Sequence, residues 1–368
     1  MMTQVKTSGD IPKKMKAVVD YKPGDFRLEE VNVPQVGPGE VLIKVGGCGI
    51  CIGDVKAFHG AARIWGGDGQ PRYIDPPVIP GHEFYGQVVA LGEGAEEIHG
   101  LSLGDWATSE QIVPCGACRF CRRGEYWMCE PHAIFGFKKG IADGGFAEYM
   151  KWNAMTRNHK LPEGFPLKIA PYIEPLGCGI HAVDRANIQL DDVVVIAGMG
   201  TLGLGMLQTA RMKNPKLLIA VDLKPNRLSL AKSLGADLVM NPATDDVVSQ
   251  VKDLTEGYGC DVYIQASGHP KGTIQGLQMI RRLGRFVEFS VYNEPVTVDW
   301  SIIGDVKELD ILGAHLSPYA YPTAIRFLHE GKVKADHIIT QELPLEDYMK
   351  GLEMMEKGDE AIKVLLKP

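Results

Sequence analysis

Residues 193–205 read VVVIAGMGTLGLG, an apolar, β-branched run that leads directly into a glycine-rich turn. Gly198, Gly200 and Gly203 have the G-x-G-x-x-G spacing, and a helical pattern follows them. A second apolar run, LLIAVD, then ends in Asp222. A strand, a glycine turn, a helix and a second strand ending in an acid form the βαβ unit that binds dinucleotides. A turn without a ligand is the alternative, but every flanking element has the context that the motif needs.

Each position of this unit has a chemical role. Gly198 permits the tight turn, Gly200 lets the backbone approach a pyrophosphate, and Gly203 lets the helix pack on the strand. The helix N-terminus then offers free N–H groups to the phosphates. Asp222 would accept hydrogen bonds from the adenine ribose and repel a 2′-phosphate, which favours NAD over NADP. The predicted cofactor-binding residues are Gly198, Gly200, Thr201, Leu202, Gly203, Asp222, Arg227, Ser267 and Gly268.

The length and net charge of the chain indicate how many domains it has and exclude some classes of partner. A chain of 368 residues is too long for one ordinary core, so two domains are expected. The net charge of −7, with scattered basic residues, argues against nucleic acid or an acidic membrane surface as a partner. No apolar run is long enough for a signal peptide or a membrane span. We expect a cytoplasmic protein that binds a small molecule. In the reducing cytoplasm, cysteines serve as metal ligands or buried thiols more often than as disulfides.

The two halves of the chain differ in the secondary structure that their sequence patterns predict. In the first half, short runs such as MKAVVDY, EVLIKV and YGQVVALG are separated by glycine and proline turns, which indicates an irregular β domain. From about residue 190, strands, glycine turns and helices alternate, which indicates a parallel sheet. The predicted fold class is therefore α/β plus β.

Residues 115–129, CGACRFCRRGEYWMC, place four cysteines in the pattern C-x2-C-x2-C-x7-C. Four thiolates from one short segment can close a tetrahedron around zinc and leave no open position, which makes such a site structural. An iron–sulfur cluster is the alternative, but the bacterial ferredoxin run ends with a spacing of three before a proline. Two disulfides are a weaker alternative. The predicted structural zinc ligands are Cys115, Cys118, Cys121 and Cys129.

These features together resemble the zinc-dependent medium-chain dehydrogenase/reductase family over almost the whole chain. In the first part the resemblance rests on GICIGDVK, PGHEFYGQVVALG, the cysteine lobe, GGFAEY and IEPLGCGIHAV. In the second part it rests on the glycine turn, LAKSLGAD, DVYIQASG and GRFVEF. It implies a GroES-like catalytic domain (1–178) with a structural zinc lobe (112–132) and a Rossmann NAD-binding domain (179–314). It also implies a return to the catalytic domain (315–368), where AIKVLLKP is similar to the family's end.

The resemblance implies a second, catalytic zinc. Cys51 aligns with the family's zinc thiolate, and His82 and Glu83 match the histidine ligand and the carboxylate beside it. Glu174 in EPLGCGIH stands where the sorbitol-like polyol branch has glutamate and another branch has cysteine. Such a ligand set leaves a position open for water or a substrate oxygen. Whether Glu83 or Glu174 binds the metal directly, or the two exchange, stays open.

Four other residues near these segments are weaker candidates for metal binding or substrate contact. Cys48 and Cys178 are interpreted as buried structural thiols, because free cysteine is among the most buried side chains, although Cys178 could supply a second thiolate. His315 and Tyr319 lie in LGAHLSPYAYP, where polyol dehydrogenases place substrate-binding residues. The resemblance therefore makes them candidates for substrate contact.

The reaction implied is hydride transfer from a secondary alcohol carbon to C4 of the nicotinamide, with zinc holding the alkoxide. Glu174 favours the sorbitol/polyol branch, and within it a tetritol (erythritol or threitol) that is oxidised to a ketose. A threonine-type or simple alcohol dehydrogenase is the alternative. A non-catalytic dinucleotide-binding relative is less favoured, since it has no need for an open metal site. By analogy, a homotetramer or homodimer is expected.

One stretch departs from the family pattern. In most relatives the second residue after the zinc cysteine is serine or threonine and the fifth is often histidine, and together they pass the substrate proton to solvent. This chain has Gly53 and Lys56 there, so that relay cannot operate. Lys56 could act as the base if zinc and burial lowered its pKa from about 10.4. Ordered water in the space left at Gly53 is the other route, and we favour it.

Overall fold

The computed structural model describes residues 5–67 and 69–368 and divides into two compact units. The first unit comprises the chain up to Glu174, Tyr321–Glu330 and Ile339–Pro368. The second comprises Pro175–Ala320 and Gly331–Ile338. The sequence placed the two main boundaries after residues 178 and 314, and it assigned residues 331–338 to the catalytic domain. Residues 1–4 of that domain lie outside the described part of the chain.

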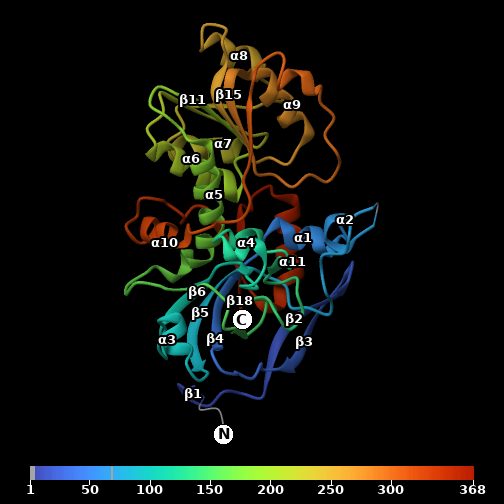
Figure 1. Cartoon of the computed structure of the whole chain (residues 1–368), viewed down its shortest axis with the longest axis vertical. Coiled ribbons are helices and arrows are strands. Elements are labelled where there is room, and N and C mark those ends of the chain that lie inside the picture. Colours follow the sequence, from blue (N-terminus) through green and yellow to red (C-terminus); the bar gives the residue numbers. More distant parts are fainter. Residues whose placement is uncertain (1–4, 68) are drawn as a thin grey trace. The chain divides into compact units, whose positions relative to one another are not determined.

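The first unit is built around an eight-stranded sheet (Figure 1). Its main path is β10 (Asn158–Lys160), β6 (Trp106–Ser109), β5 (Glu83–Leu91), β4 (Val41–Gly49), β18 (Lys363–Lys367) and β17 (Ile339–Pro344). Off this path, β1 (Lys6–Thr7) pairs with β5 and β9 (Tyr149–Trp152) pairs with β4. Two smaller sheets pair β2 (Lys14–Lys22) with β3 (Asp25–Asn32) and β7 (Ile112–Val113) with β8 (Ala133–Ile134). The predicted β-rich domain is confirmed.

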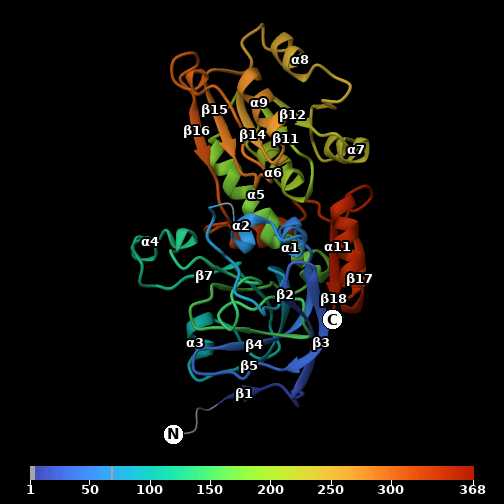
Figure 2. The same cartoon turned by 90° about the vertical axis from the view of Figure 1, so that its right-hand side faces the viewer.

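Short helices connect these strands. They are α1 (Ile52–Phe58), α2 (Ala62–Trp65), α3 (Ala95–His99), α4 (Arg119–Arg122), α10 (Tyr321–His329), α11 (Tyr348–Lys357) and the 3₁₀ helices η1 (Tyr126–Met128), η2 (Leu167–Tyr172) and η4 (Leu345–Asp347). The lobe that carries the four cysteines, with β7 and α4, projects to one side of this unit (Figure 2).

β4 is a central strand that is buried on both faces. Val41, Ile43 and Val45 point into the main hydrophobic cluster, which also holds Trp152. Leu42 points to the opposite face and packs in a second cluster. A strand largely covered on both sides needs apolar residues at almost every position, which explains the run VLIKV, in which only Lys44 is exposed. Each buried side chain of this size contributes about 1.5–3 kcal/mol.

The pairing of β4 with β5 brings two distant stretches of sequence together. Gly49 near the end of β4 pairs with Glu83 at the start of β5. Because β4 ends shortly before Cys51 and β5 begins directly after His82, these two side chains emerge at the same end of the strand pair. On the other side of β4, Leu365 of the C-terminal strand β18 pairs with Gly49. Three segments therefore meet at one point of the sheet.

The second unit is a six-stranded, fully parallel sheet. The strand order is β13 (Leu238–Met240), β12 (Leu217–Val221), β11 (Val193–Ala197), β14 (Cys260–Gln265), β15 (Ile280–Glu288) and β16 (Asp310–Gly313). The helices are α5 (Ile173–Ala186), which begins at the unit boundary, α6 (Thr201–Met212), α7 (Pro225–Ser233), α8 (Val247–Asp253), α9 (Pro270–Met279) and the 3₁₀ helix η3 (Trp300–Ile302). This is the Rossmann order, which confirms the predicted fold class. Across the described residues, no helix combines the length and apolarity that a bilayer span requires.

β2 carries a buried carboxyl group that costs stability at neutral pH. Asp20 is 1% exposed, and no described residue hydrogen-bonds to either of its carboxylate oxygens. Burial, with the nearby charge of Asp54, raises the pKa of Asp20 to about 7. Between pH ~4 and ~7 the folded protein therefore holds a proton that the unfolded chain has released. The free energy of unfolding falls as the pH rises through this window.

We expect Asp20→Asn to remove that loss. The amide is neutral at every pH, so the melting temperature of the variant should exceed that of the parent at pH 8, by an amount equivalent to about 1–3 kcal/mol, and the difference should be clearly smaller at pH 5. Calorimetric melting at both pH values measures the difference. Asp10→Asn, at an exposed carboxylate, is the control and should leave the pH dependence as it is. An Asp20→Asn protein with the parent's pH dependence would contradict the assignment.

Candidate active site and metal centres

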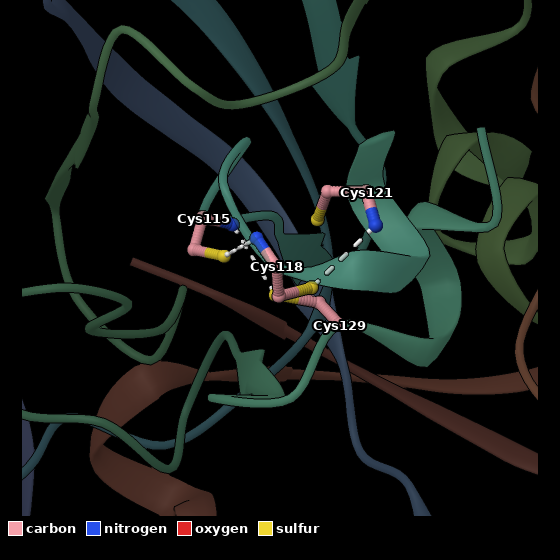
Figure 3. Close-up of side chains that lie close together, drawn as sticks. All are labelled: Cys115, Cys118, Cys121 and Cys129. Carbon is pink, nitrogen blue, oxygen red and sulfur yellow. Dashed lines mark hydrogen bonds between the residues drawn. The ribbon is translucent and has the colours of Figure 1, made fainter. Parts of the chain in front are cut away.

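The four cysteines of the lobe gather at one point, between β7 and β8 (Figure 3). Their sulfur atoms all lie within 4.8 Å of one another, and each cysteine is a free thiol. Backbone N–H groups donate to three of the sulfurs: Cys118 N to Cys115 Sγ (3.3 Å), Cys121 N to Cys118 Sγ (3.5 Å) and Cys115 N to Cys129 Sγ (3.2 Å). The N–H of Cys121 is the main reason that the pKa of the Cys118 thiol falls to about 6. Four clustered thiols, two of which (Cys115 and Cys118) have lowered pKa values because backbone N–H groups donate to them, fit a tetrahedral zinc ion.

Glu110 attaches this lobe to the sheet. Its side chain is only 2% exposed, and it accepts a hydrogen bond from the Tyr126 hydroxyl at 2.6 Å. Arg157 and His159 approach the other carboxylate oxygen at 3.3 and 3.2 Å. The Arg157 guanidinium also lies over the Tyr126 ring, 4.2 Å from its centre. A buried carboxylate with three partners fixes the helix η1, which leads into Cys129, relative to the strand β10.

A second cluster forms where β4, β5 and β18 meet. Cys51 Sγ, a ring nitrogen of His82 and a carboxylate oxygen of Glu83 lie within 4.8 Å of one another. His82 is 9% exposed, and its Nδ1 atom has no hydrogen-bond partner among the described residues. A buried imidazole nitrogen beside a thiol and a carboxylate matches the donor set that binds zinc. These residues fit a catalytic metal with fewer than four protein ligands.

Asp54 supports two of these ligands. One oxygen of its buried carboxylate accepts a hydrogen bond from the Cys51 N–H at 2.8 Å. The other lies 3.8 Å from His82 Nδ1. Asp54 therefore fixes the backbone at Cys51 and places a negative charge beside His82, as groups behind metal ligands do.

The two candidate carboxylates are held by different groups. Glu83 lies against the Lys363 ammonium, with nitrogen–oxygen distances of 2.7 and 2.6 Å, and both side chains are 2% exposed. Burial lowers the pKa of Lys363 while the charge of Glu83 raises it, and the net shift is upward, so the ammonium keeps its proton. Glu174, the second residue of α5, accepts a hydrogen bond at 2.7 Å from the amide of Gln111.

Glu83 rather than Glu174 is grouped with Cys51 and His82 in the structure. Glu174 is 7% exposed and close enough for its charge to act on both His82 and Lys363. The sequence did not single out Asp54, Gln111 or Lys363. Asp54 could have been found, because it stands three residues after Cys51 in the sequence. The contacts of Gln111 and Lys363 arise only from the tertiary fold.

Gly53 and Lys56 lie on helix α1 directly after Cys51. A Cβ atom on Gly53 would touch Cys51 Sγ at 3.7 Å and the His82 ring at 3.8 Å, which are ordinary contact distances. A serine or threonine would therefore fit without a clash and would place its hydroxyl at this cluster, where glycine has no side chain. Lys56 is half-buried, and burial lowers its pKa. Both proton routes considered from the sequence stay open.

Replacing Lys56 with methionine separates these routes. We expect Lys56→Met to retain turnover within about tenfold of the parent, equivalent to ~1.4 kcal/mol, because water can carry the proton without a large pKa shift of a lysine. The pH–rate profile of alcohol oxidation should keep its limb. A thousandfold loss with the limb abolished would identify Lys56 as the base and exclude the water route.

In the second unit, close contacts make two glycines of the turn obligatory. Gly198 has φ +97°, and a Cβ there would lie 2.7 Å from the backbone of Ser267. A Cβ on Gly203 would lie 1.7 Å from the Gly198 carbonyl oxygen. Around Gly200 the space is open, apart from an Arg227 nitrogen 3.9 Å from the Cβ position. The turn is thus closed against the sheet on one side and accessible at the start of α6, where a pyrophosphate would lie.

Asp222 lies at the same turn. It accepts hydrogen bonds from Met199 N at 2.6 Å and Lys224 N at 2.8 Å. These bonds aim the carboxylate along the edge of the turn, and each oxygen retains a lone pair for a further donor. The position suits a ribose diol and disfavours a phosphate.

The remaining predicted residues divide between the units. Ser267 and Gly268 follow β14 and border the glycine turn, while Thr201 and Leu202 begin α6. His315 and Tyr319 are exposed in the second unit. Cys48 and Cys178 are buried, and neither belongs to a metal-ligand cluster among the residues that the structure describes.

Two family models match the chain. Residues 37–163 match the alcohol dehydrogenase GroES-like domain, and residues 201–330 match zinc-binding dehydrogenases. The first segment contains both groups of potential metal ligands, the four cysteines and Cys51 with His82 and Glu83, and the second begins at the glycine turn.

Three individual proteins show how far the similarity extends. An erythritol/L-threitol dehydrogenase from Mycolicibacterium smegmatis is 49% identical over 361 residues, which cover 98% of this chain and 99% of that protein. An L-threonine 3-dehydrogenase from Pyrococcus horikoshii is 38% identical over 351 residues, covering 94% and 97%. A solved structure described as a zinc-binding dehydrogenase from Sinorhizobium meliloti 1021, bound to NADP, has a TM-score of 0.86 at 27% identity, covering 97% and 100%.

Proposed function

Because the chain belongs to the zinc-binding dehydrogenases with an alcohol dehydrogenase GroES-like domain, we propose that it oxidises a secondary hydroxyl of a small polyol with NAD as hydride acceptor. The observation that carries this proposal is the 49% identity, over 98% of the chain, to an erythritol/L-threitol dehydrogenase. A tetritol, oxidised to the corresponding ketose, is the proposed substrate.

The residues of the first unit supply the metal site of this reaction. Cys51 and His82 would hold the catalytic zinc together with a carboxylate from Glu83 or Glu174. A bound zinc ion polarises an alcohol oxygen and lowers the pKa of its hydroxyl group. Asp54 holds the Cys51 backbone, and the space beside Gly53 admits water that can take up the released proton. The four cysteines of the lobe would hold a second, structural zinc.

The second unit would bind the nucleotide. The open backbone at Gly200 and the N-terminus of α6 suit a pyrophosphate, and Asp222 suits an unphosphorylated ribose. We therefore propose NAD rather than NADP, although a protein of similar structure is described with NADP.

A threonine-type dehydrogenase is the second candidate, because an L-threonine 3-dehydrogenase is 38% identical to the chain. A substrate panel with NAD decides between them: erythritol, D- and L-threitol, sorbitol, 2,3-butanediol and L-threonine. We expect the highest kcat/KM with a tetritol. A higher value with L-threonine, or no polyol oxidation at all, would contradict the proposed function.

We further propose that the protein self-associates in the cytoplasm. The edge strand β16 is largely exposed, and apolar side chains gather on and near this edge of its sheet: Ile311 is 40% exposed, Leu283 61% and Trp300 72%. An exposed apolar edge favours pairing with another chain. Eight free thiols suit a reducing compartment. Light scattering of the purified protein tests the oligomeric state, and a monomer would contradict it.

A further inference from the structure

The strands β14 and β15 end side by side, next to the glycine turn of the second unit. Their last residues, Gln265 and Glu288, are register partners, and Gln265 also pairs with Ala197, the residue directly before Gly198. Ligands of such sheets lie outside the carboxyl ends of the strands, where the strand order reverses. Asp222 directly follows β12 on one side of the turn and suits the adenine ribose. The nucleotide that carries the nicotinamide would therefore lie over β14 and β15.

A chain of side-chain hydrogen bonds links the ends of these two strands through helix α9. Gln265 is completely buried, and its amide nitrogen donates to Thr273 Oγ1 at 3.2 Å. The hydroxyl oxygens of Thr273 and Tyr292 lie 2.5 Å apart. The Tyr292 hydroxyl also contacts one carboxylate oxygen of Glu288, and the other oxygen accepts a hydrogen bond from Ser290 N at 2.7 Å. We call Gln265, Thr273, Tyr292 and Glu288 the strand-end network.

Both ends of the strand-end network are fixed by groups that can hydrogen-bond in only one direction. The Ser267 N–H donates to the side-chain oxygen of Gln265 at 3.0 Å, so the amide nitrogen must be the atom that faces Thr273. An ionised Glu288 only accepts hydrogen bonds, so the Tyr292 hydroxyl donates to it and accepts the proton of Thr273. Each hydroxyl group then uses its single proton, which holds the network in one arrangement.

The loops that follow β14 and β15 are also tied to each other. Ser290 Oγ donates to the Gln265 carbonyl oxygen at 3.0 Å and accepts a hydrogen bond from Gly268 N at 3.0 Å. In the same loop as Gly268, the backbone of Ser267 lies against the glycine turn, 2.7 Å from the position of a Cβ atom on Gly198. A shift of the loop after β15 would therefore displace the loop that borders the glycine turn.

We propose that Tyr292 is a positioning residue for the nicotinamide half of the dinucleotide, acting through Glu288 and Thr273. This inference rests on the proposed function, because it needs a dinucleotide at the glycine turn. The bond between Tyr292 and Glu288 closes residues 289–291 into a loop, and the bond to Thr273 fixes that loop on α9. The adenine half would lie on the other side of the turn, at Asp222, and does not depend on this loop.

Binding of NADH and of ADP separates the two halves of the cofactor, and it needs no polyol. ADP contains only the adenosine and pyrophosphate parts. We expect Tyr292→Phe to raise the Kd for NADH about tenfold, equivalent to ~1.4 kcal/mol, and to leave the Kd for ADP unchanged. Titration followed by NADH fluorescence gives the first Kd, and calorimetry gives the second. The measurements are made at pH 8, because burial raises the pKa of Glu288 and its carboxyl group must be ionised.

Tyr258→Phe is the matched control, since Tyr258 is 74% exposed in the same unit. It should change neither Kd. Equal weakening of NADH and ADP binding in Tyr292→Phe would mean that the tyrosine only stabilises the unit. That result, or an unchanged Kd for NADH, would overturn the proposal.

Thr273 provides a second test that keeps the tyrosine. Thr273→Val removes the hydroxyl group at nearly constant volume and should weaken NADH binding as Tyr292→Phe does, whereas Thr273→Ser should keep the affinity of the parent. Because both residues act through one network, the double variant Tyr292→Phe/Thr273→Val should bind NADH no more weakly than Tyr292→Phe alone. Additive losses, or equal weakening in the valine and serine variants, would contradict the network.

The outcome can be separated from that of the proposed function. If the parent bound neither NADH nor ADP, the proposed cofactor would be wrong, and this inference would fall with it. If the parent bound NADH but Tyr292→Phe bound it equally well, only the role of Tyr292 would be overturned. A failure of the substrate panel leaves the binding results standing, because they involve no polyol.

Discussion

Replacing Cys51 with alanine is expected to lower polyol turnover at least about a thousandfold and to reduce the zinc content from two ions per chain to one. The variant leaves one imidazole and a carboxylate from Glu83 or Glu174, which is too weak a donor set to retain zinc at the catalytic position. Without the ion, nothing in the cluster lowers the pKa of an alcohol hydroxyl. A thousandfold loss corresponds to about 4 kcal/mol of transition-state stabilisation. Steady-state kinetics and metal analysis of the same preparation measure both quantities.

Cys178→Ala is the matched control for this experiment. It removes a buried thiol that lies outside both metal-ligand clusters of the described chain. Its zinc content should stay at two ions per chain and its turnover close to that of the parent. If Cys178→Ala loses the catalytic zinc while Cys51→Ala keeps it, the thiolate ligand has been assigned to the wrong cysteine. Full activity in Cys51→Ala would remove the catalytic metal site altogether.

The features that could be predicted from the sequence depend on local spacing. The glycine turn is specified within a few residues, because Gly198 and Gly203 leave no room for a Cβ atom. The four cysteines are likewise close in the chain, and the structure brings their sulfurs together. The family, the Rossmann fold of the second unit, the β-rich first unit and the dehydrogenase class are confirmed. The roles of the individual site residues stay predictions.

What the sequence could not show depends on contacts between distant segments. Lys363 reaches Glu83 only because β18 pairs with β4 at the C-terminal end of the chain. Gln111 donates a hydrogen bond to Glu174, which is far away in the sequence. A single glutamine belongs to no recognisable motif, so this contact could not be predicted. Asp20 sits in a strand that reads as ordinary β-structure, and nothing in its neighbours indicates a buried carboxyl without hydrogen bonds. The choice between Glu83 and Glu174 is for the same reason a question of tertiary structure.

Replacing Asp222 with serine is expected to lower the preference for NAD over NADP by about a hundredfold. The carboxylate is aimed along the glycine turn by its bonds from Met199 N and Lys224 N. Hydrogen bonds from the ribose diol to a charged acceptor contribute about 1.5–3 kcal/mol, and a 2′-phosphate at the same place would meet a negative charge. Serine removes both effects, so efficiency with NAD should fall while efficiency with NADP rises. The measurement is the ratio of kcat/KM for the two cofactors with the best polyol.

A change in the cofactor ratio must be distinguished from a general destabilisation of the glycine turn, because Asp222 also accepts hydrogen bonds from the backbone there. Asp237→Ser provides the control, because Asp237 accepts a hydrogen bond from Leu218 N at 2.7 Å in the same sheet but lies away from the glycine turn. That variant should lose stability without changing the cofactor ratio. Loss of activity with both cofactors in Asp222→Ser, at an unchanged ratio, would mean that Asp222 only supports the loop. Equal efficiency of the unmodified protein with NAD and NADP would show that Asp222 does not face the ribose, because a carboxylate in that position must repel the 2′-phosphate.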